Sequence, residues 1–220
     1  RLTLKYAPID DLVIRANAGR GLRFSNPLID NIGVLSTGKT FVGLDSVGNP
    51  LEDAWTAGGN ITYYLPFGLG SNYISFDYFH TNFAQQLVLD YDNCGANSIG
   101  LYMLDGKKSY THTFQLDFST EPIERFTITL TGRYSIAKAE YVNLGLIDSP
   151  MTRMYKAVLN LQYATNLNKW IFDFTTSLNG PCTVYKFMEQ ARDAQGNLLY
   201  PNVKTPIDPL LSLQVTKRFK

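Results

Sequence analysis

Apolar and polar side chains alternate along most of this chain with a period of two residues. Between residues 109 and 119, mostly aromatic and aliphatic side chains occupy the even positions, while hydroxyl, amide and acidic side chains occupy the odd ones. Successive side chains of a β-strand point to opposite faces, so this pattern predicts strands with one apolar and one polar face. It predicts nine strands, at residues 2–7, 11–19, 55–65, 72–83, 109–119, 125–135, 155–163, 170–179 and 211–219.

Short and long connections between these strands alternate along the sequence. The segments near 8–10, 66–71, 120–124 and 164–169 are short, whereas those near 20–54, 84–108, 137–153 and 180–208 are long. Up-and-down barrels of the outer membrane have short periplasmic turns and long extracellular loops. A soluble β-sandwich has no reason to follow this alternation, and structureless loops of this length are uncommon in compact domains. The sequence therefore predicts an all-β, antiparallel, up-and-down portion of a transmembrane β-barrel.

Four pairs of aromatic residues recur on the apolar faces, each pair eight residues apart. Eight residues at ~3.3 Å each cover about 26 Å of strand, or about 20 Å along the membrane normal at a tilt near ~40°. This is close to the ~25 Å apolar band between the two aromatic girdles of such barrels. The predicted girdle on the short-turn side contains Tyr63, Phe118, Phe126, Tyr163, Trp170 and Phe219. The predicted girdle on the long-loop side contains Trp55, Tyr110, Tyr134 and Tyr155.

The opposite faces of these strands carry charged and amide side chains. They are Arg125, Arg133, Asp117, Asp173, Lys156, Asn160 and Gln162. Such groups need hydrogen-bond partners, so this face is expected to line a watery or plugged lumen. Complete single-chain bacterial barrels usually have an even number of strands. Nine is an odd number, so we expect residues 1–220 to be a fragment of a larger barrel, whose first strand pairs with something upstream.

Composition agrees with a β-rich protein. Aromatic residues make up 13% of the chain, with 14 Tyr against 2 His, and the mean hydropathy is −0.12. No stretch approaches the roughly 18–20 apolar residues of a membrane-spanning helix. A net charge of +1 without a basic cluster in the sequence gives no support for nucleic-acid binding. Cys94 and Cys182 both fall in predicted loops, so a loop-to-loop disulfide and two free thiols stay open.

The residue types that serve in catalysis do not converge in this arrangement. Asp77 lies on the predicted inner face, whereas His80 and His112 share the lipid side. Gly19 and Gly21 are explained by a strand-end turn, because they lack the strand-to-helix setting of a phosphate-binding loop. We expect no enzymatic activity, no cofactor and no metal site.

Five segments, taken in order, resemble the C-terminal part of the TonB-dependent outer-membrane receptors. They are residues 14–23 (IRANAGRGLR), 54–62 (AWTAGGNIT), 75–83 (SFDYFHTNF), 104–110 (LDGKKSY) and 213–219 (LQVTKRF). Phe219 looks like the near-terminal aromatic of the assembly signal on the last strand, although Lys220 follows it. The resemblance covers nearly the whole chain. It implies that residues 1–220 are the C-terminal portion of a ~22-stranded barrel, its last nine strands, with the plug domain and upstream strands outside the sequence.

The resemblance also implies a function and a place in the cell. It implies import of a scarce nutrient (an iron chelate, haem, cobalamin, a glycan or a metal complex) through the outer membrane of a Gram-negative bacterium. The implied partners are outer-membrane lipid, the TonB complex and the barrel-assembly machinery. Candidate cargo contacts are the loop aromatics Phe41, Tyr102, Tyr185 and Tyr200. Two alternatives stay open: a complete small porin or adhesin barrel, and a soluble β-sandwich binding module.

Overall fold

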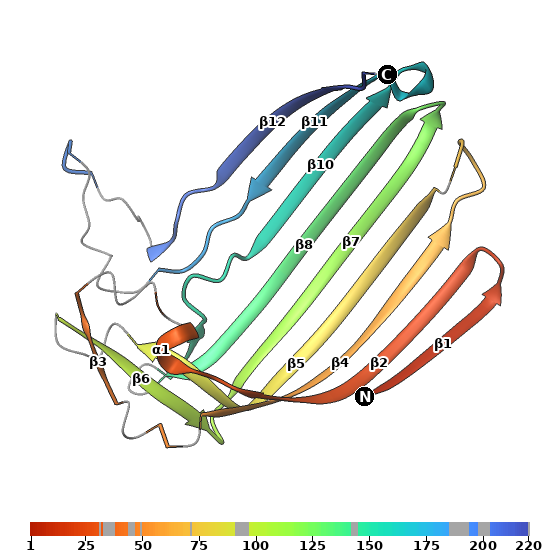
Figure 1. Cartoon of the computed structure of the whole chain (residues 1–220). Helices are drawn as coiled ribbons and strands as arrows, with labels where there is room; N and C mark the ends of the chain where they lie inside the picture. The colour runs from red at the N-terminus through yellow and green to blue at the C-terminus, as the bar shows by residue number, and fades with distance from the viewer. Residues whose placement is uncertain are drawn as a thin grey trace.

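The chain folds into one curved sheet whose nine long strands lie side by side and antiparallel (Figure 1). The computed structural model describes residues 1–220 except 31, 33–37, 44–46, 49, 71, 91–96, 142–144, 185–193, 198–202 and 220. In spatial order the long strands are β1 (Leu2–Ile9), β2 (Leu12–Phe24), β4 (Leu51–Tyr64), β5 (Tyr73–Asp90), β7 (Ser109–Ile123), β8 (Phe126–Tyr141), β10 (Tyr155–Ala164), β11 (Trp170–Asn179) and β12 (Asp208–Lys217). The predicted up-and-down path of nine strands is confirmed.

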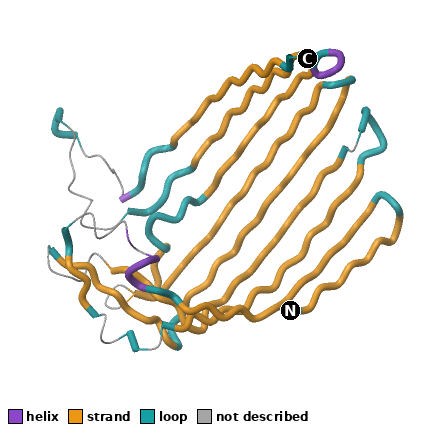
Figure 2. The backbone as a smooth tube through the Cα atoms, in the orientation of Figure 1, coloured by secondary structure: helices purple, strands orange, loops and turns teal. Residues whose placement is uncertain are grey.

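The connections differ at the two ends of the sheet, as Figure 2 shows. One end carries short turns, including a 3-10 turn at Asn166–Asn168 between β10 and β11. The other end, which we call the loop end, carries α1 (Pro27–Asp30), β3 (Thr40–Val42), β6 (Ser98–Asp105) and β9 (Gly145–Asp148). None of the helices in the described part of the chain is long and apolar enough to cross a membrane.

The segments predicted as long loops contain more strand than the sequence indicated. β2, β5 and β8 each extend beyond the predicted limits, and β6 and β9 pair with the extended ends of β5 and β8. A bulge in β5 explains part of this difference. Ala54 pairs with Phe83 and Asp53 with Gln85, so Ala84 has no register partner in β4 and the two faces exchange beyond it. The alternation therefore breaks at a point where pairing continues.

One face of the sheet, the apolar face, remains exposed along its length. Leu130 and Leu159 pair across β8 and β10 on this face, and Leu116 and Leu130 are 43% and 40% exposed. A buried apolar cluster of Val88, Leu104, Ala139 and Tyr141 lies instead at the loop end. In a β-sandwich the apolar faces of two sheets bury each other. The exposed apolar face therefore disfavours the soluble sandwich alternative.

Side chains of the short turns hold that end of the sheet together. Asn72 is buried and donates a side-chain hydrogen bond to the Phe67 carbonyl in the β4–β5 turn. Its Oδ1 accepts a hydrogen bond from the Glu121 N–H near the end of β7 (2.6 Å). The Leu69 N–H donates to the Glu121 carbonyl (2.7 Å). Two neighbouring turns are thus tied to each other as well as to their strands.

Two adjacent glycines in β4 give a matched test of the packing on the two faces. A Cβ on Gly58 would lie 2.3 Å from the Phe79 ring and 2.6 Å from the Tyr78 carbonyl oxygen, whereas on Gly59 its nearest neighbour is the Arg15 carbonyl at 3.4 Å. We expect Gly58→Ala to destabilise the protein by about 1–3 kcal/mol, because ring and backbone must both shift. Gly59→Ala should change stability far less. Denaturant unfolding in detergent measures both, and equal effects would contradict this packing.

Candidate functional site

A continuous row of polar side chains crosses the second face of the sheet, the polar face, from edge to edge. Each member is paired directly with the next across neighbouring strands. We call this set the polar row: Lys5, Arg15, Asn60, Asp77, Gln115, Arg133, Lys156, Asn179 and Asp208. Because register and not sequence distance aligns these residues, the row exists only in the folded sheet.

Asn60 is the centre of the hydrogen-bond network in the first half of the row. Its Oδ1 accepts from Arg15 Nη1 (3.0 Å) and from the Thr62 hydroxyl (2.9 Å). Its Nδ2 donates to Ser75 Oγ (2.7 Å) and to Asp77 Oδ1 (2.8 Å). The Asn60 amide lies between the Arg15 guanidinium and the Asp77 carboxylate and gives each of them a hydrogen-bond partner without a direct ion pair. The positive and negative charges in this part of the polar face are therefore balanced within the sheet.

The remaining polar face is hydrogen-bonded in the same way from strand to strand. Asp117 accepts from Thr131 Oγ1 (2.6 Å) and from Gln115 Nε2 (2.8 Å). Gln162 Nε2 donates to Asp173 Oδ1 at 2.8 Å. Polar side chains on a wall need such partners wherever bulk water is restricted. The face is therefore suited to line an aqueous or filled lumen.

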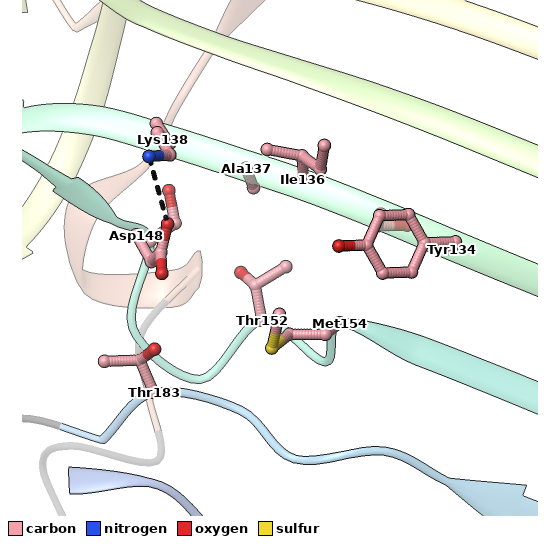
Figure 3. Close-up of a pocket in the computed structure, with 10 residues that line it drawn as sticks. Tyr134, Ile136, Ala137, Lys138, Asp148, Thr152, Met154 and Thr183 are labelled. Carbon is pink, nitrogen blue, oxygen red and sulfur yellow. Dashed lines mark ion pairs between the residues drawn. The ribbon is translucent and has the colours of Figure 1, made fainter. Parts of the chain in front are cut away.

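A gap opens in the sheet at the loop end, where β8 changes partner from β10 to β9. Residues 149–154 leave the sheet there and form one wall of a pocket of about 250 Å³. Figure 3 shows Tyr134, Lys138, Asp148 and Thr183 around this pocket, with Lys138 Nζ 3.7 Å from Asp148 Oδ1. Thr152 also lines a second, larger pocket, of about 440 Å³, together with Arg133, Arg153 and Lys156. Residues 149–154 thus lie between these two pockets at the loop end of the sheet.

The eight-residue aromatic pairs lie on the apolar face, and their levels shift from strand to strand. Tyr63 and Phe118 share one register row, but Trp170 lies six residues from that row, five strand-to-strand steps away from Tyr63. At ~3.3 Å per residue and ~4.8 Å between strands, this offset is a slope of about 40°. In the loop-side girdle, Tyr155 is offset by four residues toward the short-turn end from the register row of Trp55, and the two residues are four strand-to-strand steps apart. That offset is a slope of about 35°.

Between β4 and β10 the shift of both girdles is one step of four residues between β7 and β8, where Tyr110 pairs with Lys138 and Phe118 with Leu130. Phe126 and Tyr163 pair directly across β8 and β10, as do Tyr134 and Tyr155. Tyr110 shares the register row of Trp55. Both predicted rings therefore run obliquely across the strands, in parallel. Their contact with lipid remains a prediction.

Two of the four predicted cargo contacts, Phe41 and Tyr102, lie in the described part of the chain, on the paired strands β3 and β6. Phe41 lies in β3 and pairs with Ile99 of β6. Tyr102, predicted in a loop, lies instead in β6 and packs against the buried cluster of Val88 and Leu104. The predicted loop positions of Phe41 and Tyr102 are wrong, because β3 pairs with β6 and β6 pairs with the extended end of β5. Tyr185 and Tyr200 lie outside the described residues.

Two further predictions concern Phe219 and the two cysteines. Phe219 lies two residues beyond the end of β12, so the predicted strand limit of 211–219 is wrong, although the Arg218 N–H still donates to the Lys169 carbonyl (2.9 Å). Cys182 is buried with a free thiol, and Cys94 lies outside the described residues. The Cys182 sulfur lies 3.5 Å from the Thr205 hydroxyl.

Asp77 and the two histidines lie on opposite faces, as predicted. Asp77 is bonded to Asn60 on the polar face, whereas His80 and His112 stack on the apolar face with ring centroids 4.5 Å apart. The Tyr78 hydroxyl lies 2.9 Å from His112 Nδ1. Carboxylate and imidazoles are therefore separated by the thickness of the sheet.

Comparison with known proteins finds likeness in structure only. No protein-family model and no curated protein matches the sequence. The ferric enterobactin receptor PfeA of Pseudomonas aeruginosa, solved with enterobactin, matches 99% of this chain at a TM-score of 0.65 and 13% identity. The ferric preacinetobactin receptor BauA of Acinetobacter baumannii matches 97% at a TM-score of 0.58 and 12% identity.

The chain spans about a third of the length of these two solved structures, 32% and 28% respectively. At this level of identity the likeness concerns the fold. The fold that the sequence predicted, a portion of an antiparallel up-and-down β-barrel, is confirmed.

Proposed function

We propose that residues 1–220 form the C-terminal part of the barrel wall of a TonB-dependent receptor, which imports a scarce nutrient across the outer membrane of a Gram-negative bacterium. The wall contributes lipid contacts on its apolar face and lumen contacts on its polar face. Its loop end would face the cell exterior and its short turns the periplasm. TonB, outer-membrane lipid and the assembly machinery are the proposed partners, and the role is transport and not catalysis.

The slope of the aromatic rings is the observation that carries this proposal. Strands of outer-membrane barrels tilt by ~35–45° from the membrane normal. The aromatic residues on the apolar face shift along the strands by the amount that keeps them level under such a tilt, about 40° on one side and about 35° on the other. A soluble sheet has no reason to place its aromatics along two parallel oblique lines.

The two edges of the sheet support a larger barrel over a complete small one. β1 lies at one edge and β12 at the other, and in the described part of the chain they pair only with β2 and β11. A barrel in the membrane must close, because unpaired backbone groups in lipid are costly. We infer that further strands of the same protein complete the circle. The likeness to about a third of two receptors agrees with this inference.

The importer function predicts that cargo contacts and membrane insertion are separable. Deleting residues 186–199, most of which lie outside the described residues, should leave the full-length protein inserted because loop length costs little free energy. Cargo affinity should fall by roughly tenfold or more, as when a few central contacts of an interface are lost. Surface labelling measures insertion, and nutrient-limited growth and cargo binding measure function.

A strain without TonB is the control for this test, because an energised importer should fail there even with its loops intact. Unchanged uptake in both the loop-deleted and the TonB-less strains would refute the importer function. Such a result would leave the fold in place and point to a passive barrel.

A further inference from the structure

Three cationic residues line the larger pocket of the loop end, and two of them, Arg133 and Lys156, belong to the polar row. Arg133 of β8 and Lys156 of β10 are directly opposite each other in the register. Arg153 joins them from the segment before β10, where it forms a β-bridge with Cys182. All three line the pocket of about 440 Å³, together with Asn179, which is buried.

No carboxylate compensates these charges in the described part of the chain. Arg20, Arg23 and Arg125 all form ion pairs with acidic residues, whereas Arg133 and Lys156 form none among the described residues. Arg153 Nη1 donates only to the carbonyl of Gly180 (3.0 Å). Like charges directly opposite each other on neighbouring strands destabilise a sheet. The sheet therefore carries an unfavourable charge arrangement here, as it also does at its first edge, where Lys5 lies opposite Arg15.

The chemistry of the pocket selects a class of ligand. Guanidinium groups bind carboxylate and phosphate oxygens through paired hydrogen bonds, and an ammonium adds a compact charge. Asn179 adds a neutral polar residue to the lining, and Met151 adds an apolar one. A volume of about 440 Å³ lies within the usual range for small-molecule sites.

The position of the pocket decides what reaches it. Arg133 and Lys156 adjoin Tyr134 and Tyr155 in sequence, so they lie behind the predicted loop-side girdle, on the polar face. In a barrel this is the part of the lumen that a molecule entering from the exterior meets beneath the loops. The position of the pocket therefore suits the binding of an entering molecule and not the closing of the barrel.

We propose that Arg133, Lys156 and Arg153 form a binding site for a small molecule that carries at least two acidic groups, carboxylates or phosphates. The inference rests on the proposed function and narrows the cargo to multiply anionic compounds. Binding relieves the repulsion between the opposed cations, because the ligand places negative charge between them. The site thus completes its charge balance only when it is occupied.

Calorimetric binding of pyrophosphate and of citrate to the full-length protein in detergent tests this site. The double variant Arg133→Gln/Lys156→Gln should bind either anion at least about tenfold more weakly for each cation removed, because hydrogen bonds to charged groups are strong. Affinity of the wild-type protein should also fall as salt rises. Arg153→Gln is a poor test, because it also removes the hydrogen bond to Gly180.

Lys5→Gln is the matched control, since Lys5 is a cation of the same polar row at the far edge of the sheet and outside the pocket. It should leave anion binding unchanged. Thermal unfolding gives a second readout: pyrophosphate should raise the Tm of the wild-type protein and of Lys5→Gln, but not of the double variant.

Equal anion affinity in the wild-type protein and the double variant would overturn the inference. So would an absence of anion binding by the wild-type protein combined with a lower Tm of the double variant, because an acidic segment of the protein itself would then fill the pocket. The two proposals can also fail separately. If the uptake test fails but the wild-type protein binds the anions and the double variant does not, the importer function is refuted and the anion site stands. If uptake behaves as the importer function predicts but the double variant binds the anions as tightly as the wild-type protein, only the anion site is refuted.

Discussion

Leu159→Arg in the full-length protein is expected to lower the free energy of unfolding by roughly 2–4 kcal/mol. Leu159 lies on the apolar face, four residues from both Tyr155 and Tyr163, and pairs with Leu130 and Thr176. If the aromatic pairs mark the two girdles, this position lies at mid-membrane, where a charged group facing lipid is most costly. Denaturant unfolding in lipid or detergent measures the effect.

Asn160→Arg is the matched control, one residue away on the same strand. Asn160 lies on the polar face and donates a hydrogen bond to Thr175 Oγ1 (2.8 Å). Its replacement should cost only about 1 kcal/mol for that bond, since the new charge stays in the lumen. Equal costs at the two positions would show that the two faces do not have different surroundings, and the membrane assignment would fail.

Phe219→Ala is expected to reduce the amount of protein in the membrane several-fold while leaving cargo affinity normal in the fraction that inserts. Phe219 is 81% exposed, and Lys217 Nζ lies 4.8 Å from the centroids of both the Phe219 and Trp170 rings. The Lys217 ammonium thus makes cation–π contacts with both aromatic rings at the short-turn end of the sheet. The last strand must find a partner for its open edge if the barrel is to close.

Arg218→Ala is the control for Phe219→Ala, because it changes the adjacent side chain while keeping the backbone hydrogen bond to Lys169. It should leave surface abundance nearly unchanged. Surface labelling and cargo binding are measured on both variants and on the protein that lacks residues 186–199. Normal insertion of Phe219→Ala together with failed insertion of the loop deletion would mean that the sheet is oriented the other way in the membrane.

The alternation of side chains was enough to find the long strands and their two faces. Which face a side chain takes depends only on its position along its own strand, so Asp77 was correctly separated from His80 and His112 without knowledge of any partner. The eight-residue aromatic pairs are likewise a property of single strands. The alternation of short and long connections then indicated the path of the sheet, because hairpins force neighbours to run in opposite directions.

Register and strand extent were decided by the tertiary structure, because they depend on hydrogen bonds between segments far apart in the sequence. β6 and β9 form where the ends of β5 and β8 offer them partners, and the bulge at Ala84 hides the end of β5 from any test of alternation. Tyr102 consequently belongs to a strand and not to a loop.

Register also created the features that carry function. Arg133 and Lys156 are 23 residues apart in the sequence, each within an ordinary alternating strand, and nothing local marks them as a pair. Pairing of β8 with β10 places them opposite each other, and the segment before β10 adds Arg153. The slope of the aromatic rings arises in the same way, from pairs that the sequence supplied and from offsets between strands that only the folded sheet defines.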